Sequence, residues 1–253
     1  MRFGAPHRHY RVTDSTNERA RELVEAGAPG GTVVTAREQT AGRGRKGRVW
    51  TAPEGKALLY SAILRPLDER HLLLPLSAPL AVCTAAEELR PGIECQVKWP
   101  NDVWLEQRKL SGILIEARPQ DGWAVIGIGL NLSIAPDEFP PNLRHPATSL
   151  FGATTGSRGE SRRSLPAVAP AGLPPTPSTA ASVVSRHLDR WVWAGQDEVL
   201  TEWRRRDGLL GREISWEDGS GIADGIDDRG NLVVAVAGGG RVSLGAGEVQ
   251  LRI

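Results

Sequence analysis

Four short apolar stretches with brief connections between them limit the folds open to this chain. The stretches cover residues 95–99, 102–105, 110–117 and 123–130. Several of the connections contain Gly or Pro, which favours antiparallel neighbours joined as hairpins. Residues 32–36 and 57–64 also have strand patterns. The sequence therefore predicts a domain built around a sheet of largely antiparallel strands.

Helical patterns occur before, between and after these strands, which places the chain in the α/β class. Glu18 lies three residues after Ser15, a spacing that fits a capping box at the start of a first helix. Residues 77–89 fit a buried helix, provided that Pro79 lies in its first turn. A further helix is expected to begin near Thr179, with apolar residues along one face.

The end of the chain has a different pattern, with short apolar stretches and Gly-rich turns. The expected strands are residues 212–216, 221–226, 232–237, 241–244 and 249–253. Five short strands so close together favour a small all-β barrel. Residues 152–182 consist mostly of Gly, Pro, Ala, Ser and Thr and are read as a low-complexity loop. We expect a first domain over residues 1–207 and a β domain over residues 208–253.

Composition excludes several classes of protein. The 31 basic and 30 acidic side chains leave a net charge of +1, which argues against a dedicated nucleic-acid-binding protein. Two cysteines are too few for a disulfide scaffold or a four-cysteine zinc site and favour a reducing compartment. The histidines lack ligand spacing, with His7 and His9 in an expected frayed terminus, so no protein-bound metal is expected. Neither a signal peptide nor a membrane span is expected, and the predicted location is the cytoplasm.

Residues 42–48, which we call the arginine loop, read Gly-Arg-Gly-Arg-Lys-Gly-Arg. The glycine spacing matches dinucleotide-binding and kinase loops, but no helical pattern follows, and the chain has no His-Arg-Asp or Asp-Phe-Gly triplet. Glycines let backbone N–H groups approach an anion, and arginines supply paired donors to phosphate or carboxylate. Without an anion the cations should repel one another and leave the loop mobile. A solvated surface loop is the alternative.

Residues 98–102 read Lys-Trp-Pro-Asn-Asp, and Lys109 follows after one short hairpin. If Asp102 and Lys109 lie on paired strands, their side chains can converge. A lysine neutralises phosphate charge, and an aspartate can take a proton from an incoming amine. The alternative for Lys98 and Asp102 is a surface ion pair.

The motifs, their order and their separations resemble those of bacterial biotin protein ligases. The resemblance rests on Ser15-Thr16-Asn17, residues 38–50 from Glu38-Gln39 to Val49-Trp50, residues 98–102, residues 109–116, and Gly127-Ile128-Gly129-Leu130-Asn131. It is strong over about residues 10–150 and weak over residues 203–253, where it rests on the strand pattern and residues 247–251. It implies a mixed, largely antiparallel sheet with flanking helices, as in class II synthetase-like biotin ligases, and a C-terminal SH3-like β-barrel.

The resemblance also implies two reactions at one site. Biotin attacks the α-phosphate of ATP, which is carried with Mg²⁺, and gives biotinyl-5′-AMP and pyrophosphate. A lysine of a biotin carboxyl carrier domain, part of a biotin-dependent carboxylase, then takes the biotin and releases AMP. Because the first motif begins at Ser15, a monofunctional ligase without the N-terminal DNA-binding domain is expected. The oligomeric state is left open between monomer and homodimer.

The resemblance assigns the expected site residues. The catalytic group is Arg45, Asp102 and Lys109, with Asp102 as base toward the amine. The biotin-binding group is Ser15, Thr16, Asn17, Gln39, Gly42, Arg43, Gly44, Arg45, Lys109 and Gly112. The ATP or adenylate group is Arg43, Arg45, Trp50, Lys98, Asn101 and Asn131, with Trp50 shielding the adenylate from water.

Two alternative functions remain at this stage. A lipoate ligase or octanoyl transferase would share the broad fold, although its Arg-Arg-x-x-Gly-Gly-Gly pattern is absent from the chain. A nucleic-acid-binding module could use the arginine loop on phosphates, but the near-zero net charge argues against it.

Overall fold

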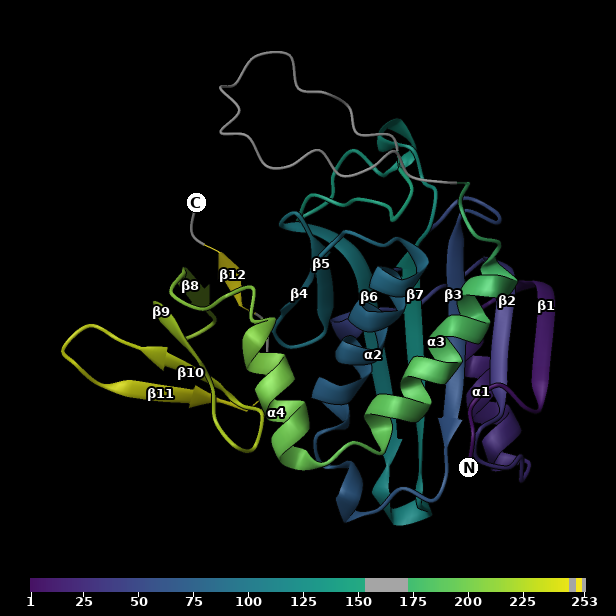
Figure 1. The fold of residues 1–253 in the computed structure, drawn as a ribbon, viewed down its shortest axis with the longest axis horizontal. Helices are drawn as coiled ribbons and strands as arrows, with labels where there is room; N and C mark the ends of the chain where they lie inside the picture. The colour runs from purple at the N-terminus through teal and green to yellow at the C-terminus, as the bar shows by residue number, and fades with distance from the viewer. Residues whose placement is uncertain (153–172, 246–248, 252–253) are drawn as a thin grey trace.

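The computed structural model describes residues 1–152, 173–245 and 249–251, and its centre is a seven-stranded sheet (Figure 1). The strand order is β1-β2-β3-β7-β6-β5-β4. The strands are β1 (His7–Thr13), β2 (Val33–Gln39), β3 (Ala57–Leu64), β4 (Cys95–Lys98), β5 (Asp102–Leu105), β6 (Arg108–Arg118) and β7 (Trp123–Asn131). Only β1 and β2 pair in parallel; all other neighbours in this sheet are antiparallel. The prediction of a mixed, largely antiparallel sheet is confirmed, because the brief connections after Cys95 do form hairpins.

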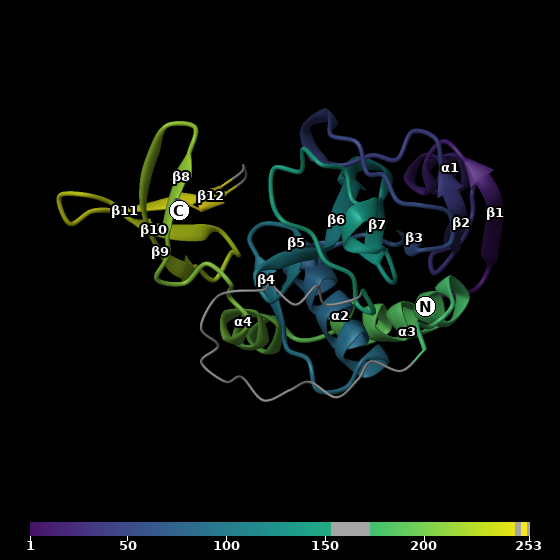
Figure 2. The ribbon, with the colours of Figure 1, turned by 90° about the horizontal axis from the view of Figure 1, so that it is seen from above.

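Helices cover both faces of this sheet, as the view from above shows (Figure 2). Helix α1 (Thr16–Glu25) lies on one face, and helices α2 (Leu74–Leu89) and α3 (Pro177–Val192) lie on the other. Strand β3 is buried along its whole length, since helices cover it on both sides. This is why β3 reads as a continuous apolar run rather than an alternating one.

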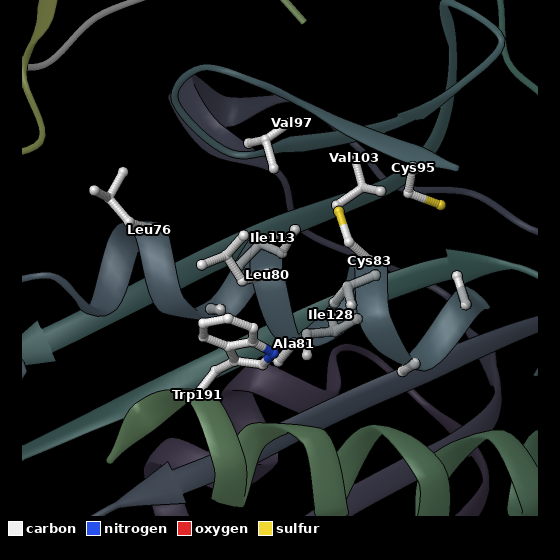
Figure 3. Packing of buried hydrophobic residues seen from close by; sticks show 14 of the residues in the cluster. Leu76, Leu80, Ala81, Cys83, Cys95, Val97, Val103, Ile113, Ile128 and Trp191 are labelled. Atoms are coloured by element: carbon white, nitrogen blue, oxygen red, sulfur yellow. The ribbon is translucent and has the colours of Figure 1, made fainter. Parts of the chain in front are cut away.

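The main core lies between the sheet and helices α2 and α3. Leu80 and Ala81 of α2 and Trp191 of α3 pack near Ile113 of β6 and Ile128 of β7 (Figure 3). Both cysteines are free thiols buried in the same core. The apolar face of each helix therefore fixes its position on the sheet.

Helix α2 starts earlier than the sequence pattern predicts. It begins at Leu74 rather than Ser77, with Pro75 in the first turn, so Pro79 lies inside the helix. Pro79 has no N–H to donate to the carbonyl four residues before it. The helix tolerates this loss because eleven of its 16 residues are buried, most of them in the core with the sheet and α3.

The expectation of a frayed N-terminus is wrong, because residues 7–13 form the edge strand β1. His7 Nε2 lies 2.8 Å, and His9 Nδ1 2.9 Å, from the hydroxyl of Thr35 on β2. Side chains of β1 are largely exposed, so its sequence lacks the apolar alternation that marks a strand.

A second, five-stranded antiparallel sheet lies beyond the β4 edge of the first and has the order β11-β10-β9-β8-β12 (Figures 1 and 2). Its strands are β8 (Glu213–Trp216), β9 (Gly219–Ile226), β10 (Leu232–Ala235), β11 (Arg241–Leu244) and β12 (Gln250–Leu251). The expected C-terminal β structure is confirmed, although parts of the expected strand 249–253 and of the 247–251 motif lie outside the described residues. Most of the expected loop 152–182 also lies outside them, and its last residues belong to α3.

Helix α4 (Gln196–Arg205), which the sequence analysis did not predict, lies between α2 and the second sheet (Figures 1 and 2). Hydrogen bonds join the segment around β4 to the second sheet and its turns. Lys98 Nζ donates to the carbonyl of Val249 at 3.1 Å, and Trp99 Nε1 donates to the carbonyl of Gly230 at 3.1 Å. Within the described ranges, no helix has the length and apolar character needed to cross a membrane.

Replacing Arg206 with alanine is expected to lower the free energy of unfolding by about 3–5 kcal/mol, the cost of breaking a buried ion pair. Arg206 is 5% exposed and donates to Glu87 Oε2 at 2.9 Å and to Glu202 Oε1 at 2.6 Å. Denaturant unfolding measures the loss. Arg205→Ala is the matched control, because exposed Arg205 also pairs with Glu202 and should cost less than about 1 kcal/mol. Equal losses in both variants would contradict the argument.

Candidate functional site

A cavity of about 110 Å³ lies beside the N-terminus of α1, between residues 43–50 and strands β5, β6 and β7. It brings together most of the residues that the sequence analysis selected. Those lining it are Ser15, Thr16, Asn17, Gln39, Arg43, Gly44, Arg45, Trp50, Asn101, Asp102, Lys109 and Gly112. Motifs far apart in the sequence therefore form one site.

Hydrogen bonds among polar side chains build the floor of this cavity. Thr16 donates its backbone N–H to Gln39 Oε1 at 2.7 Å, and its hydroxyl lies 3.0 Å from the same oxygen. The hydroxyl of Ser61 on β3 lies 2.6 Å from Asn17 Oδ1 and 2.8 Å from Thr16 Oγ1. Thr16, Asn17 and Ser61 are all buried. Their contacts hold the floor rigid.

This floor has more acceptors than protons. Gln39 Oε1 and Asn17 Oδ1 only accept; Gln39 Oε1 receives the Thr16 hydroxyl proton, and the single Ser61 proton has two acceptors, Asn17 Oδ1 and Thr16 Oγ1. Thr16 and Asn17 line the cavity, and their oxygens keep lone pairs to offer, with Ser61 behind them. The floor is therefore suited to a ligand that presents N–H donors.

The predicted capping box does not form. Ser15 is the N-cap of α1, but its side chain makes no capping bond. The backbone N–H of Ser15, which Glu18 would accept in a capping box, instead donates to Asp14 Oδ1 at 2.6 Å. Glu18 pairs with Arg21 and Arg43.

Glycines in β6 and β7 let large side chains approach the sheet. A Cβ at Gly127 would lie 2.1 Å from Asn17 Oδ1, and a Cβ at Gly129 would lie 2.4 Å from the indole of Trp50. The Trp50 ring therefore packs directly on the backbone of β7. Its Nε1 is buried without an acceptor and remains available as a donor.

The arginine loop folds back on itself and crosses the cavity. Gly44 N–H donates to the Arg48 carbonyl at 2.8 Å, and Trp50 N–H donates to the Gly42 carbonyl at 2.9 Å. Carboxylates of Glu18 and Glu116 each lie 3.2 Å from the guanidinium of Arg43. These contacts give Arg43 two partners from outside the loop. The expectation that the loop is mobile until an anion binds stays a prediction.

Arg45 points toward the β5 side of the cavity. Its Nη1 donates to Asn101 Oδ1 at 3.3 Å, and Asn101 Nδ2 donates to the carbonyl of Ile113 at 2.7 Å. Burial lowers the pKa of Arg45, and the negative charge of Asp102 opposes that shift. The guanidinium stays charged and is directed by Asn101.

Asp102 and Lys109 converge as the hairpin predicts. Lys109 Nζ lies 2.7 Å from Asp102 Oδ1 and 5.7 Å from the centre of the Trp50 ring. Asp102 is 8% exposed. Both Asp102 and Lys98 are buried, so the alternative of a surface ion pair is wrong. An ammonium group and a carboxylate meet at one wall of the cavity.

Three selected residues do not line the cavity. Gly42 lies against Gln39 and the backbone of Trp50. Asn131 donates to the carbonyl of Thr148 at 2.9 Å. Lys98 donates a hydrogen bond to the carbonyl of Val249 in the C-terminal segment. Burial lowers the pKa of Lys98, and the negative charge of Asp102 opposes that shift. Their ligand roles stay predictions.

Sequence reasoning missed several residues of the site. Ser61 lies within an apolar strand run, with no local signal of its role. Glu116, at the end of the 109–116 motif, contacts both Asn17 and Arg43. The signal for Gly127 and Gly129 was available, because glycine inside a strand often marks the close approach of another group.

The α/β fold therefore holds a small-molecule site that combines an acceptor-rich pocket, an arginine loop and an Asp–Lys pair. The model of the biotin/lipoate A/B protein ligase family matches residues 9–133, and that of the biotin protein ligase C-terminal domain matches residues 209–252. The biotin–[acetyl-CoA-carboxylase] ligase of Mycobacterium tuberculosis is 34% identical, over 94% of this chain and 85% of its own length. The chain therefore belongs to the biotin protein ligase family.

Two further similarities define how far the match extends. The bifunctional ligase/repressor BirA of Bacillus subtilis is 42% identical over 57% of this chain, but the chain spans only 46% of that relative. The structure of biotin protein ligase from Aquifex aeolicus in complex with biotin and ATP superposes with a TM-score of 0.75 and 28% identity. That superposition covers 98% of this chain and 99% of the other.

Proposed function

We propose that this chain is an ATP-dependent, AMP-forming biotin protein ligase that activates biotin as biotinyl-5′-AMP and transfers it to a carrier-domain lysine. The acceptor-rich floor beside the arginine loop carries the proposal. Biotin has a cyclic urea with two N–H donors at one end and a carboxylate at the other. The urea matches the acceptor oxygens of Thr16 and Asn17, which line the cavity and are held from behind by Ser61. The carboxylate matches Arg43, Arg45 and Lys109.

In the first reaction a carboxylate oxygen of biotin bonds to the α-phosphorus of ATP, and the bond to the β-phosphate oxygen breaks, releasing pyrophosphate. Arg43, Arg45 and Lys109 offset the repulsion between the two anions and the charge that develops on phosphorus. Mg²⁺ enters with ATP. Over residues 1–152, 173–245 and 249–251, no group of three or more metal-ligating side chains comes together.

In the second reaction the lysine amine of the carrier bonds to the acyl carbon of the adenylate, and the bond from that carbon to the phosphate oxygen breaks, releasing AMP. The amine loses a proton, and Asp102 is the carboxylate at the cavity wall that takes it. Lys109 neutralises Asp102 in this structure. An adenylate phosphate competes for Lys109 and leaves Asp102 available to the amine.

Trp50 limits the size of the cavity and is placed to cover a bound adenylate. The cavity of about 110 Å³ is smaller than the roughly 300–1,000 Å³ of typical small-molecule pockets. The Trp50 ring occupies the space over Gly129. Ligand entry therefore requires Trp50 to move, after which the indole can close over the adenylate and exclude water.

The proposal extends to the partner, the location and the domains. The acceptor is a biotin carboxyl carrier domain of a biotin-dependent carboxylase, and the site of action is the cytoplasm, where ATP and such carriers occur together. Both free cysteines fit a reducing compartment. The two separate sheets support a division into residues 1–207 and 208–253.

The deciding experiment combines the protein with biotin, ATP, Mg²⁺ and a carrier domain. Intact mass spectrometry should show one added biotinoyl group, and none when ATP is omitted. Lipoate in place of biotin tests the alternative ligase. Its ring has no N–H donors and would leave the floor acceptors unpaired, so slow or absent transfer is expected. Transfer of lipoate but not biotin would overturn the proposal.

Replacing Gly127 with alanine is expected to weaken biotin binding at least about tenfold, because the new methyl group would displace Asn17 Oδ1. Isothermal titration with biotin alone measures the change. Gly195→Ala is the matched control, since no atom lies within 4 Å of its added Cβ. Unchanged biotin affinity in Gly127→Ala would remove Asn17 from the proposed urea site.

A further inference from the structure

Glu116 lies between the two halves of the proposed site. It belongs to β6, and each of its carboxylate oxygens has a different partner. Oε2 accepts from Asn17 Nδ2 at 2.8 Å, and Oε1 lies 3.2 Å from Arg43 Nη2. One side chain thus contacts both the acceptor-rich floor and the arginine loop.

Toward the floor, Glu116 determines which way the Asn17 amide points. A side-chain amide can rotate by half a turn and exchange its oxygen with its nitrogen. An ionised carboxylate only accepts, so it holds Nδ2 toward β6, where the carbonyl of Leu114 lies at 3.4 Å. Asn17 Oδ1 is then fixed toward Ser61 and remains an acceptor at the floor.

Toward the loop, Glu116 shares Arg43 with Glu18. The two carboxylates lie 3.2 Å from Nη2 and Nη1 respectively, so together they fix the plane of the guanidinium. The Arg43 side chain is 47% exposed, so each ion pair is individually weak. The carboxylate of Glu18 pairs with Arg21 as well as with Arg43.

We infer that Glu116 is a positioning residue that orients Asn17 for the urea ring and Arg43 for the carboxylate and phosphate. This inference rests on the proposed function. One carboxylate therefore fixes the position of Asn17 relative to Arg43. Removing the carboxylate should affect biotin binding and adenylate retention separately.

Three variants separate the two roles. Glu116→Gln keeps an oxygen that can accept from Asn17 but removes the charge opposite Arg43. Glu116→Ala removes both contacts. Glu18→Gln is the matched control, because it removes one charge from Arg43 and leaves the Asn17 contact in place.

The affinity for biotin alone and the dissociation rate of biotinyl-5′-AMP are then measured. Biotin affinity should fall about tenfold or more in Glu116→Ala, the loss expected for a hydrogen bond to a charged group, and stay near the parent value in both Gln variants. Adenylate should dissociate up to about fivefold faster in both Gln variants, the range for an exposed ion pair. A purely structural role would instead lower thermal stability and leave both ligand measurements unchanged, which would overturn the inference.

A measurement without ligand keeps the two proposals distinct. Hydrogen exchange of the Asn17 side-chain amide, followed by NMR, should be faster in Glu116→Ala than in the parent and in Glu18→Gln. Equal exchange in all three overturns the orienting role whatever the ligand. A parent protein that binds no biotin, with Asn17 exchange still controlled by Glu116, would instead overturn the proposed function.

Discussion

Arg45→Ala is expected to lower the rate of biotin transfer to a carrier domain by about 10²–10³-fold, the usual cost of removing one preorganised donor from a developing charge. Arg45 reaches the cavity wall, where Asn101 directs its guanidinium. Without this cation the adenylate either fails to form or escapes into solution. The fold should survive, because Arg45 lies in a loop and is not part of the core.

Pyrophosphate release measures adenylate formation, and chromatography of the filtrate measures escaped adenylate. Lys46→Ala is the matched control, because this neighbouring cation is exposed and does not line the main cavity. The control should keep nearly the parent rate. If Arg45→Ala biotinylated the carrier domain as fast as the parent, the proposed role of the arginine loop would be wrong.

The sequence predicts the central sheet well because local chemistry determines it. Brief turns after residues 98, 105 and 118 place each strand beside the next one along the chain, so the antiparallel pairing follows. The hairpin formed by β5 and β6 explains why the sequence alone predicts that Asp102 and Lys109 converge. Five motifs then meet in one cavity because they lie on neighbouring strands, in the loop between β2 and β3 and at the start of α1.

Elements whose stability comes from distant partners could not be predicted in this way. Strand β1 is polar and is held in the sheet by its pairing with β2. In that pairing His7 lies beside Val33, a residue twenty-six positions later in the chain. Helix α4 has only three buried side chains, and Arg206 beyond its end is fixed by Glu87 of α2. The capping box failed because Asp14, outside the motif, took the donor that Glu18 would have accepted.

The site shows the same limit. Ser61 is indistinguishable in sequence from any small residue of a buried strand, and its role appears only when α1 lies over β3. Glu116 ends a motif, yet its two partners come from α1 and the arginine loop. Periodicity predicts the face of a residue, but long-range contacts decide what that residue binds.

Asp102→Asn is expected to slow transfer of biotin from preformed adenylate to the carrier lysine by about 10²–10⁴-fold, the range for losing a general base. Asparagine keeps the shape and the contact with Lys109 Nζ but cannot take a proton from the amine. The rate of adenylate formation should fall much less, because Asp102 carries no positive charge that would stabilise the phosphate. Adenylate should therefore accumulate on the enzyme.

Single-turnover transfer from enzyme-bound biotinyl-5′-AMP, with the carrier in excess, isolates this step. Lys109→Gln is the contrasting variant, because Lys109 faces the anion and its loss should slow adenylate formation more than transfer. The ratio of the two rates therefore moves in opposite directions in the two variants. Lys109 Nζ lies 2.7 Å from Asp102 and competes with the carrier amine for its carboxylate. Lys109→Gln therefore leaves Asp102 free to act as the base, whereas Asp102→Asn removes that base. Unchanged single-turnover transfer in Asp102→Asn would exclude Asp102 as the base and leave the amine to lose its proton to solvent.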